Sequence, residues 1–239
     1  MITTFILLAL SCHCIQAFTS SSNAFHKVST KLYSSPPATP EELIATPSLW
    51  DPIKESLNSV PAFACTNSQG QPLQYNVAGT TLAFFYLDIE AAKTELAKAS
   101  DEIDEKLTIT PFPLGEVFAL SIQKTALMIP SEAGLTAAGA PLGMNPVGQQ
   151  VPLFGCLSMI ETLEDGTTNI PLFLSQKEAQ KAMDMALETV EDDKKDEFEI
   201  SILPLAGAIQ AQANEGGKKS FTYVPEQSSL DYLRLLEEK

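Results

Sequence analysis

Two cysteines are the side chains in the body of this chain with the clearest capacity for chemistry. Cys65 and Cys156 each follow a phenylalanine by two residues. A reactive thiol needs a histidine, an arginine or a helix N-terminus beside it to lower its pKa. The only histidines are His13 and His26, near the N-terminus, and the only arginine is Arg234. The residue types therefore favour two buried core cysteines; a regulatory disulfide between them stays open as an alternative, and a catalytic thiol is disfavoured.

Other motifs of enzymes and metal-binding proteins are missing from the sequence. Beyond residue 40 there is no histidine and no Cys-x-x-Cys pair, so zinc ligands are lacking. The D-x-D-x-D-G spacing of a calcium loop is absent as well. The glycine-containing stretch 134–148 matches neither a phosphate loop nor a dinucleotide fingerprint, and a serine triad would lack its base. We therefore expect no enzymatic activity, no metal and no cofactor.

The charge balance excludes some partners and favours others. The chain has 15 basic and 30 acidic residues, and two of the basic residues (Lys27 and Lys31) but none of the acidic ones precede Glu41. The remaining 13 basic and 30 acidic residues give the body a formal charge of −17. Nucleic-acid binding needs clustered arginine and lysine, so we exclude it. An acidic body instead attracts basic partners.

The N-terminal segment has the composition of a targeting leader. Residues 1–17 are apolar at their centre and end in a small residue, which predicts a secretory signal peptide. Residues 18–40 are rich in serine and threonine and contain no acid, which predicts a disordered, transit-peptide-like segment. Together they resemble the bipartite leaders of algae with secondary plastids. A simple secreted protein with a disordered N-terminus is the alternative.

The body of the chain, 41–239, reads as one domain built from two repeats, 60–149 and 151–239. Four blocks recur in the same order, at offsets of 91, 88, 91 and 95 residues: Val60–Cys65 with Val151–Cys156, Leu82–Tyr86 with Ile170–Leu174, Ile109 and Pro113-Leu114 with Ile200 and Pro204-Leu205, and Leu127–Pro130 with Thr222–Pro225. Two copies are too few for a solenoid. A pseudo-twofold arrangement of the two repeats is therefore expected.

Each repeat alternates strand and helix patterns without strict βαβ order, which favours an α+β fold with antiparallel or mixed strands. An apolar strand precedes an alanine-rich helix that begins near Asp88 in the first copy and near Ser175 in the second. Two more strands are predicted after each helix, one of them at Val117–Leu120. An amphipathic helix with Trp50 and Ile53 on its apolar stripe precedes the repeats. This helix either packs on the core or docks on a membrane surface or a partner.

The order of these blocks resembles the Tic twenty-two-kilodalton family, soluble components associated with the translocon of the chloroplast inner envelope. The residues that carry the resemblance are Val60-Pro61-Ala62-Phe63, Asn67–Gly70, Leu114-Gly115-Glu116-Val117, Val151-Pro152-Leu153-Phe154 and Pro171-Leu172-Phe173-Leu174-Ser175. The resemblance covers about residues 48–239. The chain departs from the family pattern in its long Gly/Ala segment, 131–150, and in its bipartite leader.

The resemblance implies two similar halves with apolar grooves, no catalytic residues, and a chaperone-like escort of preproteins between the envelope membranes of a plastid. Its expected partners are preproteins with their transit peptides and envelope translocon subunits, with peripheral membrane association. The residues that we expect to bind polypeptide are Trp50, Ile53, Phe84, Tyr86, Leu172 and Leu174. Ordinary core packing is the alternative for each. A redox-responsive protein with a Cys65–Cys156 pair and a carrier of apolar ligands are the competing functions.

Overall fold

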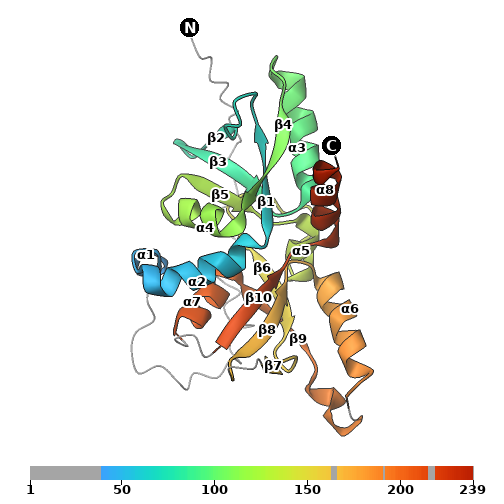
Figure 1. Ribbon diagram of the computed structural model, residues 1–239. Helices are drawn as coiled ribbons and strands as arrows, with labels where there is room; N and C mark the ends of the chain where they lie inside the picture. Colours follow the sequence, from blue (N-terminus) through green and yellow to red (C-terminus); the bar gives the residue numbers. More distant parts are fainter. Residues whose placement is uncertain (1–38, 163–165, 191, 215–218, 239) are drawn as a thin grey trace.

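A computed structural model describes residues 39–162, 166–190, 192–214 and 219–238. Two mixed sheets of five strands each lie one beside the other, and helices cover both of their faces (Figure 1). The elements up to the end of the first repeat are α1 (Pro40–Ile44), α2 (Pro47–Asn58), β1 (Pro61–Thr66), β2 (Gln74–Val77), β3 (Thr80–Tyr86), α3 (Ile89–Glu102), β4 (Thr108–Pro113), α4 (Leu114–Ile122), β5 (Ala126–Ile129) and α5 (Glu132–Ala137). The second repeat contains β6 (Pro152–Cys156), β7 (Glu161–Thr162), β8 (Thr168–Phe173), α6 (Gln176–Leu187), a 3-10 helix (Asp192–Glu197), β9 (Ile200–Pro204), α7 (Leu205–Asn214), β10 (Lys219–Val224) and α8 (Gln227–Glu237).

The two repeats have the same strand topology, which confirms the predicted duplication and the α+β class. The first sheet, sheet A, has the order β2-β3-β1-β4 with β5 parallel to β3. The second sheet, sheet B, has the order β9-β6-β8-β10, in which β10 is parallel to β8 and β7 also pairs with β8. The predicted offset of 91 holds in β1 and β6, because Cys65 faces Ile109 across one strand pair and Cys156 faces Ile200 across the other.

The offset of 88 predicted for β3 and β8 is wrong by one residue. Phe63 pairs with Tyr86, whereas its equivalent Phe154 pairs with Phe173, so the offset here is 87. The backbone N–H of Leu87 donates to Ile129, and that of Leu174 donates to Val224, in the same relation. Since side chains alternate across a strand, the slip exchanges the two faces of the strand.

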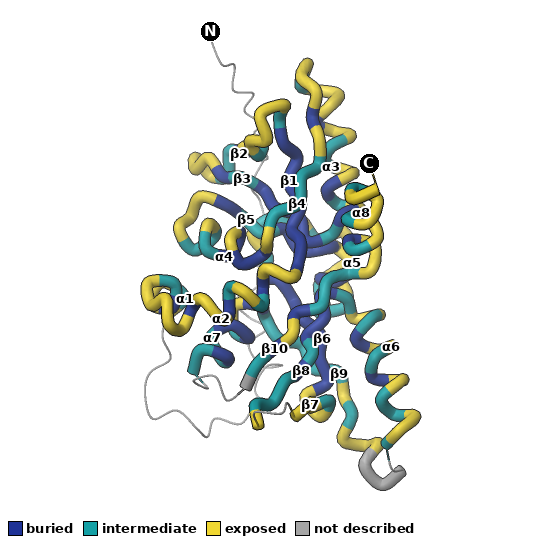
Figure 2. The backbone as a smooth tube through the Cα atoms, viewed as in Figure 1, coloured by how far each residue is buried: buried dark blue, intermediate teal, exposed yellow. Residues whose placement is uncertain are grey.

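One face of each sheet contributes to a large shared core, and we call this the inner face. Helices α2, α4 and α7 pack against the inner faces, where the strands of both sheets bury small, aliphatic and aromatic side chains. The central strands β1 and β6 are buried along their whole length (Figure 2). We call the opposite side the outer face. Helices α3 and α8 cover it on sheet A, and α6 and α5 cover it on sheet B.

Helix α4 corrects the strand predicted at Val117–Leu120. The chain turns into this helix directly after Pro113, and Val117 and Phe118 are buried against the inner face. A short apolar run does not distinguish a strand from a buried helix by its periodicity. Its equivalent α7, in the second repeat, was not predicted. The helix begins with the same hydrogen bond in both copies. The backbone N–H of Leu114 donates to the carbonyl of Val60, and that of Leu205 donates to the carbonyl of Val151.

The amphipathic helix before the repeats is confirmed as α2, and it belongs to the shared core. Trp50, Ile53 and Leu57 are at most 5% exposed, and the Trp50 ring lies 5.7 Å from that of Phe118. Ser56 also donates from its hydroxyl to the carbonyl of Phe221 in β10, at 2.8 Å. Helix α2 therefore joins the two repeats through their inner faces.

The last helix of each repeat crosses to the other sheet. Ala137 at the end of α5 packs on Phe154 of sheet B, while Tyr232 of α8 lies edge-on against Phe63 of sheet A at 5.7 Å. Ser131 and Glu226, the residues that precede these two helices, meet where the helices start. The Ser131 hydroxyl donates to Glu226 Oε1 at 3.3 Å. This junction is where the pseudo-twofold relation brings equivalent positions together.

Two predictions about the N-terminus lie outside the described residues. These are the signal peptide at 1–17 and most of the transit-peptide-like segment at 18–40. Within the part of the chain that the structure describes, none of the helices combines the length and the apolar character that crossing a membrane requires.

Candidate functional site

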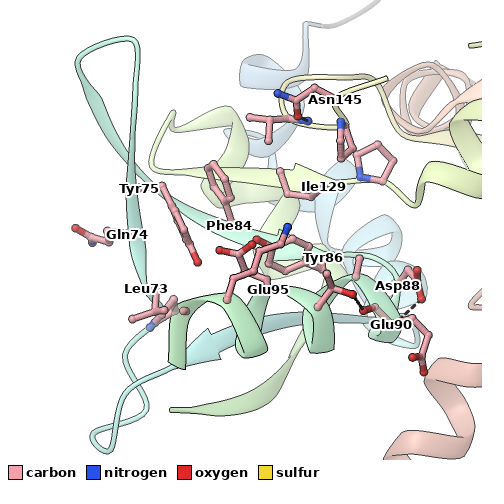
Figure 3. Close-up of a pocket in the computed structure, with 18 of the residues that line it drawn as sticks. Leu73, Gln74, Tyr75, Phe84, Tyr86, Asp88, Glu90, Glu95, Ile129 and Asn145 are labelled. Carbon is pink, nitrogen blue, oxygen red and sulfur yellow. Dashed lines mark hydrogen bonds between the residues drawn. The ribbon is translucent and has the colours of Figure 1, made fainter. Parts of the chain in front are cut away.

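A groove of about 1160 Å³ opens on the outer face of sheet A, between its strands and helix α3 (Figure 3). We call it the outer groove. It is lined by β2 and β3, by one face of α3, and by the segment that follows α5. Its volume exceeds that of a typical small-molecule pocket, about 300–1000 Å³. The outer groove therefore has room for several residues of an extended polypeptide.

Aromatic rings form the strand side of the groove. Tyr75 of β2 stacks on Phe84 of β3, with ring centroids 4.3 Å apart and an angle of 16° between the planes. The hairpin that aligns them turns at Ala78 and Gly79, which both have positive φ, the conformation that a tight two-residue hairpin requires. Figure 3 shows these two rings facing the groove beside Ile129.

Helix α3 supplies the acidic side of the groove. The Asp88 side chain caps this helix by accepting the N–H of Glu90 at 2.9 Å. Residues spaced three and four apart share one helix face, so Ala91, Glu95 and Glu102 line the groove together. The carboxylates that line the groove are Asp88, Glu90, Glu95, Glu102, Glu105 and Glu132. Lys98 is the single basic side chain among the described residues that line it.

The Gly/Ala-rich segment after α5 closes one end of the groove. This segment was the part of the chain that departs from the family pattern, and the structure places Asn145, Pro146 and Val147 in the groove wall. The side chain of Asn145 accepts the N–H of Val147 at 3.0 Å, which fixes a local turn. Val147 packs against the same apolar cluster as Tyr75 and Phe84.

A polar group lies at the base of the aromatic wall. The Tyr75 side chain, in a residue only 8% exposed, ends in a hydroxyl that makes no hydrogen bond of normal geometry among the described residues. Figure 3 shows this hydroxyl directed towards Glu95 and Tyr86. Burial, and then the charge of Glu95, raise the pKa of Tyr75 well above its usual value. Burial, followed by the neighbouring Tyr75, does the same to the pKa of Tyr86. Both hydroxyls therefore keep their protons at neutral pH, and each can donate as well as accept a hydrogen bond.

The structure divides the six residues predicted to bind polypeptide into two groups. Phe84 and Tyr86 line the outer groove, although they are only 4% and 7% exposed. The other four are also buried, but they lie in the shared core and not beside the groove: Trp50, Ile53, Leu172 and Leu174. For these four the prediction of an exposed binding surface is wrong, and core packing accounts for them. The one-residue slip explains the error, because Leu172 and Leu174 are equivalent to Phe85 and Leu87 on the inner face.

The structure does not bring the two cysteines together. Both thiols are free and buried. Cys65 Sγ points to the carbonyl of Ala92 in α3, at 3.7 Å, so it lies on the outer face of sheet A. Cys156 lies two residues after Phe154 in β6, so the two side chains share the outer face of sheet B, under α6. Burial, with a smaller contribution from Glu95, raises the pKa of the Cys65 thiol from 9.0 to about 12. These positions fit core cysteines rather than the redox pair.

Sequence reasoning missed Tyr75, Glu95 and Val147. A signal for the first was present, since Leu73, Tyr75 and Val77 alternate with polar residues as in a strand with one apolar face. The helix that carries Glu95 was predicted, but only the fold shows that one of its faces borders a groove. Across the described residues there is no group of three or more His, Cys, Asp or Glu side chains arranged to hold a metal ion.

Solved structures of similar fold include two Tic22 proteins. Tic22 from Plasmodium falciparum superposes with a TM-score of 0.61 at 18% identity, over 78% of this chain and 98% of that one. Tic22 from Anabaena, described as a protein of protein transport, superposes with a TM-score of 0.57 at 19% identity, over 77% of this chain and 96% of that one. No protein-family model matches the chain, and no curated protein matches its sequence. The structural likeness spans nearly all of both Tic22 chains, and this chain therefore has a Tic22-like fold.

Proposed function

We propose that this protein is a non-enzymatic accessory factor of protein import into plastids. It binds incoming precursor polypeptides between the envelope membranes, in a chaperone-like manner, and hands them to translocon subunits. The Tic22-like fold supports this role, since the Anabaena structure of that fold is described as a protein of protein transport. The leader predicted at residues 1–40 supports delivery to a plastid.

The outer groove is the observation that carries the proposal. It combines a wall of stacked aromatic rings, formed by Tyr75 and Phe84, with a rim of six carboxylates. Aromatic rings bind apolar and planar groups of many sequences, as a factor with diverse clients requires. The carboxylate rim attracts chains that are basic and poor in acid, which is the composition of transit peptides.

Electrostatic attraction acts before any contact forms. The body of the protein, with a formal charge of −17 beyond residue 40, produces a field that raises the association rate of a basic segment. Salt screens this field over about 8 Å at physiological ionic strength. The association rate should therefore fall with added salt, while the aromatic contacts persist.

The competing functions fit the groove less well. An apolar ligand carrier would bury its ligand away from charge, whereas carboxylates surround this opening. A redox-responsive protein would need its thiols near one another, and here they lie under different helices. Polypeptide binding uses both the apolar and the acidic sides of the groove.

The test is calorimetric titration of the full chain with a 20-residue peptide that is rich in Ser and Thr, contains lysine and lacks acid. Lys27 and Lys31 are first replaced by alanine, so that the chain's own basic segment does not compete. We expect saturable binding that Val147→Asn weakens, because this substitution removes an apolar contact beside the aromatic wall without changing the charge. The matched control is Met185→Asn, at a position 62% exposed on α6, which should bind normally. Equal binding by both variants would contradict the role of the outer groove.

A further inference from the structure

We infer that the outer groove contains a subsite for one lysine or arginine side chain, formed by Glu95, Tyr75 and Tyr86. This inference rests on the proposed function and names the chemistry that the groove reads in its polypeptide. The subsite lies at the base of the aromatic wall, where Figure 3 shows the three side chains converging.

The first observation is the unpartnered hydroxyl of Tyr75. A buried polar group without a hydrogen bond is destabilising, so native proteins nearly always satisfy such groups with protein, water or ligand. Tyr75 is 8% exposed, and its hydroxyl makes no hydrogen bond of normal geometry among the described residues, although Glu95 and Tyr86 lie close enough to interact with it. Figure 3 shows the hydroxyl directed towards these two side chains, which also line the groove, so a group that enters the groove can supply the missing partner.

The second observation is that the acceptors outnumber the donors around this point. Glu95 is half-buried, and its ionised carboxylate can only accept hydrogen bonds. Each tyrosine hydroxyl accepts as well as donates. A lysine ammonium has three donors and no acceptor, so it can donate to Glu95, Tyr75 and Tyr86 together. A guanidinium, with five donors in a plane, satisfies the same set.

The third observation is that the chain's own cations leave this point open. Lys98 lies three residues after Glu95 and also lines the groove, but no ion pair joins the two in the part of the chain that the structure describes. Lys93 pairs with Glu90 at 2.7 Å, with its ammonium 5.8 Å from the ring of Tyr232. Neither lysine forms an ion pair with Glu95, so its carboxylate is open to a cation from another chain.

The aromatic wall adds a second attraction for a cation. The face of an aromatic ring attracts a cation within about 6 Å of its centroid, more strongly when water is excluded. The stacked pair of Tyr75 and Phe84 offers such a surface directly above the hydroxyl. The aliphatic stem of a lysine can lie along these rings while its ammonium reaches Glu95.

The test compares two 20-residue peptides that differ at one central position, lysine in one and norleucine in the other. Both are rich in Ser and Thr and free of acid, and each is titrated into the full chain with Lys27→Ala and Lys31→Ala. We expect the lysine peptide to bind about tenfold more tightly, the size of one buried charged hydrogen bond or cation–π contact. Glu95→Gln should abolish this preference, and Tyr75→Phe should reduce it.

The matched control is Glu102→Gln, which removes the same charge from the same face of α3, two turns further on, in the same groove. It should retain the lysine preference. An unchanged preference in Glu95→Gln, or an equal loss in both variants, would overturn the subsite, since the second result shows a general charge effect. Circular dichroism checks that each variant is folded.

A separate readout keeps this inference distinct from the proposed function. If neither peptide binds, the proposal of polypeptide binding fails. The subsite is then tested with Nα-acetyl-lysine amide alone. Saturable NMR shifts of the Tyr75 and Tyr86 ring signals, absent with the norleucine analogue and in Glu95→Gln, would support the subsite. The absence of shifts with the lysine compound would overturn it.

Discussion

The replacement Glu226→Gln should make the protein's stability less sensitive to pH. Glu226 precedes α8 and sits at the junction where the two repeats meet. Burial, and then the neighbouring carboxylates of Asp88 and Glu178, raise its pKa from 4.5 to about 7, while the hydrogen bond from Ser131 opposes the shift. Glu178 is itself held there, because its Oε1 accepts the N–H of Gln227 at 2.6 Å. Ser175, the residue before α6, makes no side-chain cap bond, so Glu178 is free of the reciprocal contact that a capping box would give it.

The direction in which stability changes with pH follows from whether the folded or the unfolded state holds the Glu226 proton. The folded protein keeps the Glu226 proton up to about pH 7, whereas the unfolded chain loses it near pH 4.5. The free energy of unfolding therefore falls as the pH rises between these two values. Each unit of pKa shift corresponds to about 1.4 kcal/mol, which sets an upper limit of about 3 kcal/mol; because the side chain is partly exposed, screening reduces the effect to about 1–2 kcal/mol.

The assay is chemical unfolding of the wild type and of Glu226→Gln at half-unit steps from pH 4 to pH 8.5. The difference between their unfolding free energies isolates Glu226 from the other acids of the chain. We expect the variant to gain about 1–2 kcal/mol on the wild type across this range, with most of the gain between pH 5 and pH 7. Glu237→Gln, an exposed position on the same helix, serves as the control. A difference that stays flat with pH, or the same trend in the control, would refute the reasoning.

Three further predictions test how the core is packed. Gly115→Ala should lower the free energy of unfolding by about 1–3 kcal/mol in a denaturant titration, because the added Cβ would lie 2.7 Å from the carbonyl oxygen of Lys54. Unchanged stability would show that α2 and α4 are not in close contact. Leu172→Ala should lower the free energy of unfolding by about 2–5 kcal/mol, because this residue is fully buried. The peptide affinity of the folded variant should be unchanged, since Leu172 lies away from the outer groove. A loss of affinity with normal stability would show that Leu172 belongs to the binding surface. With Cys12 and Cys14 replaced by serine, the folded protein should react slowly with a thiol reagent and run identically on reducing and non-reducing gels. The reason is that Cys65 and Cys156 are buried and that the pKa of Cys65 is about 12. Rapid reaction or a mobility shift would support a Cys65–Cys156 redox pair.

The sequence predicted the duplication well because repeated backbone contacts leave repeated residues. The pairings of Pro61 with Pro113 and of Pro152 with Pro204 are one contact made twice, and both prolines that end β4 and β9 lie on edge strands, where a missing N–H is tolerated. The starts of α3 after Asp88 and of α6 after Ser175 were also visible from local residue preferences, although only Asp88 makes a side-chain cap bond. Local chemistry and repetition therefore sufficed for the class and most of the element order.

The face of each strand was harder to predict. The strands β3 and β8 are apolar on both sides, so a one-residue slip in the alignment leaves the pattern looking equally good. Only the pairing of Phe63 with Tyr86 reveals which side chains face outward. Helices α4 and α7 were hidden for a related reason, since a short and mostly apolar helix lacks the continuous polar face that marks amphipathic ones.

The outer groove could not be predicted because its walls are distant in sequence. Tyr75, Glu95 and Val147 come from a strand, a helix and a loop, and nothing local to any one of them indicates the others. The Gly/Ala segment that looked like an irregular insertion supplies one of these walls. A close reading of β2 would have found the aromatic face, but not what it borders.

The central claim is that precursor polypeptides occupy the outer groove, and site-specific photo-crosslinking in import-arrested plastids tests it most directly. A photo-reactive amino acid is placed at Val147 in the groove wall and, in a second protein, at Met185, an exposed apolar position on α6. We expect arrested precursors to crosslink from Val147, together with envelope translocon subunits in the same complexes, and not from Met185. Equal crosslinking from both positions, or none from Val147 while the protein is present in the envelope, would contradict the account.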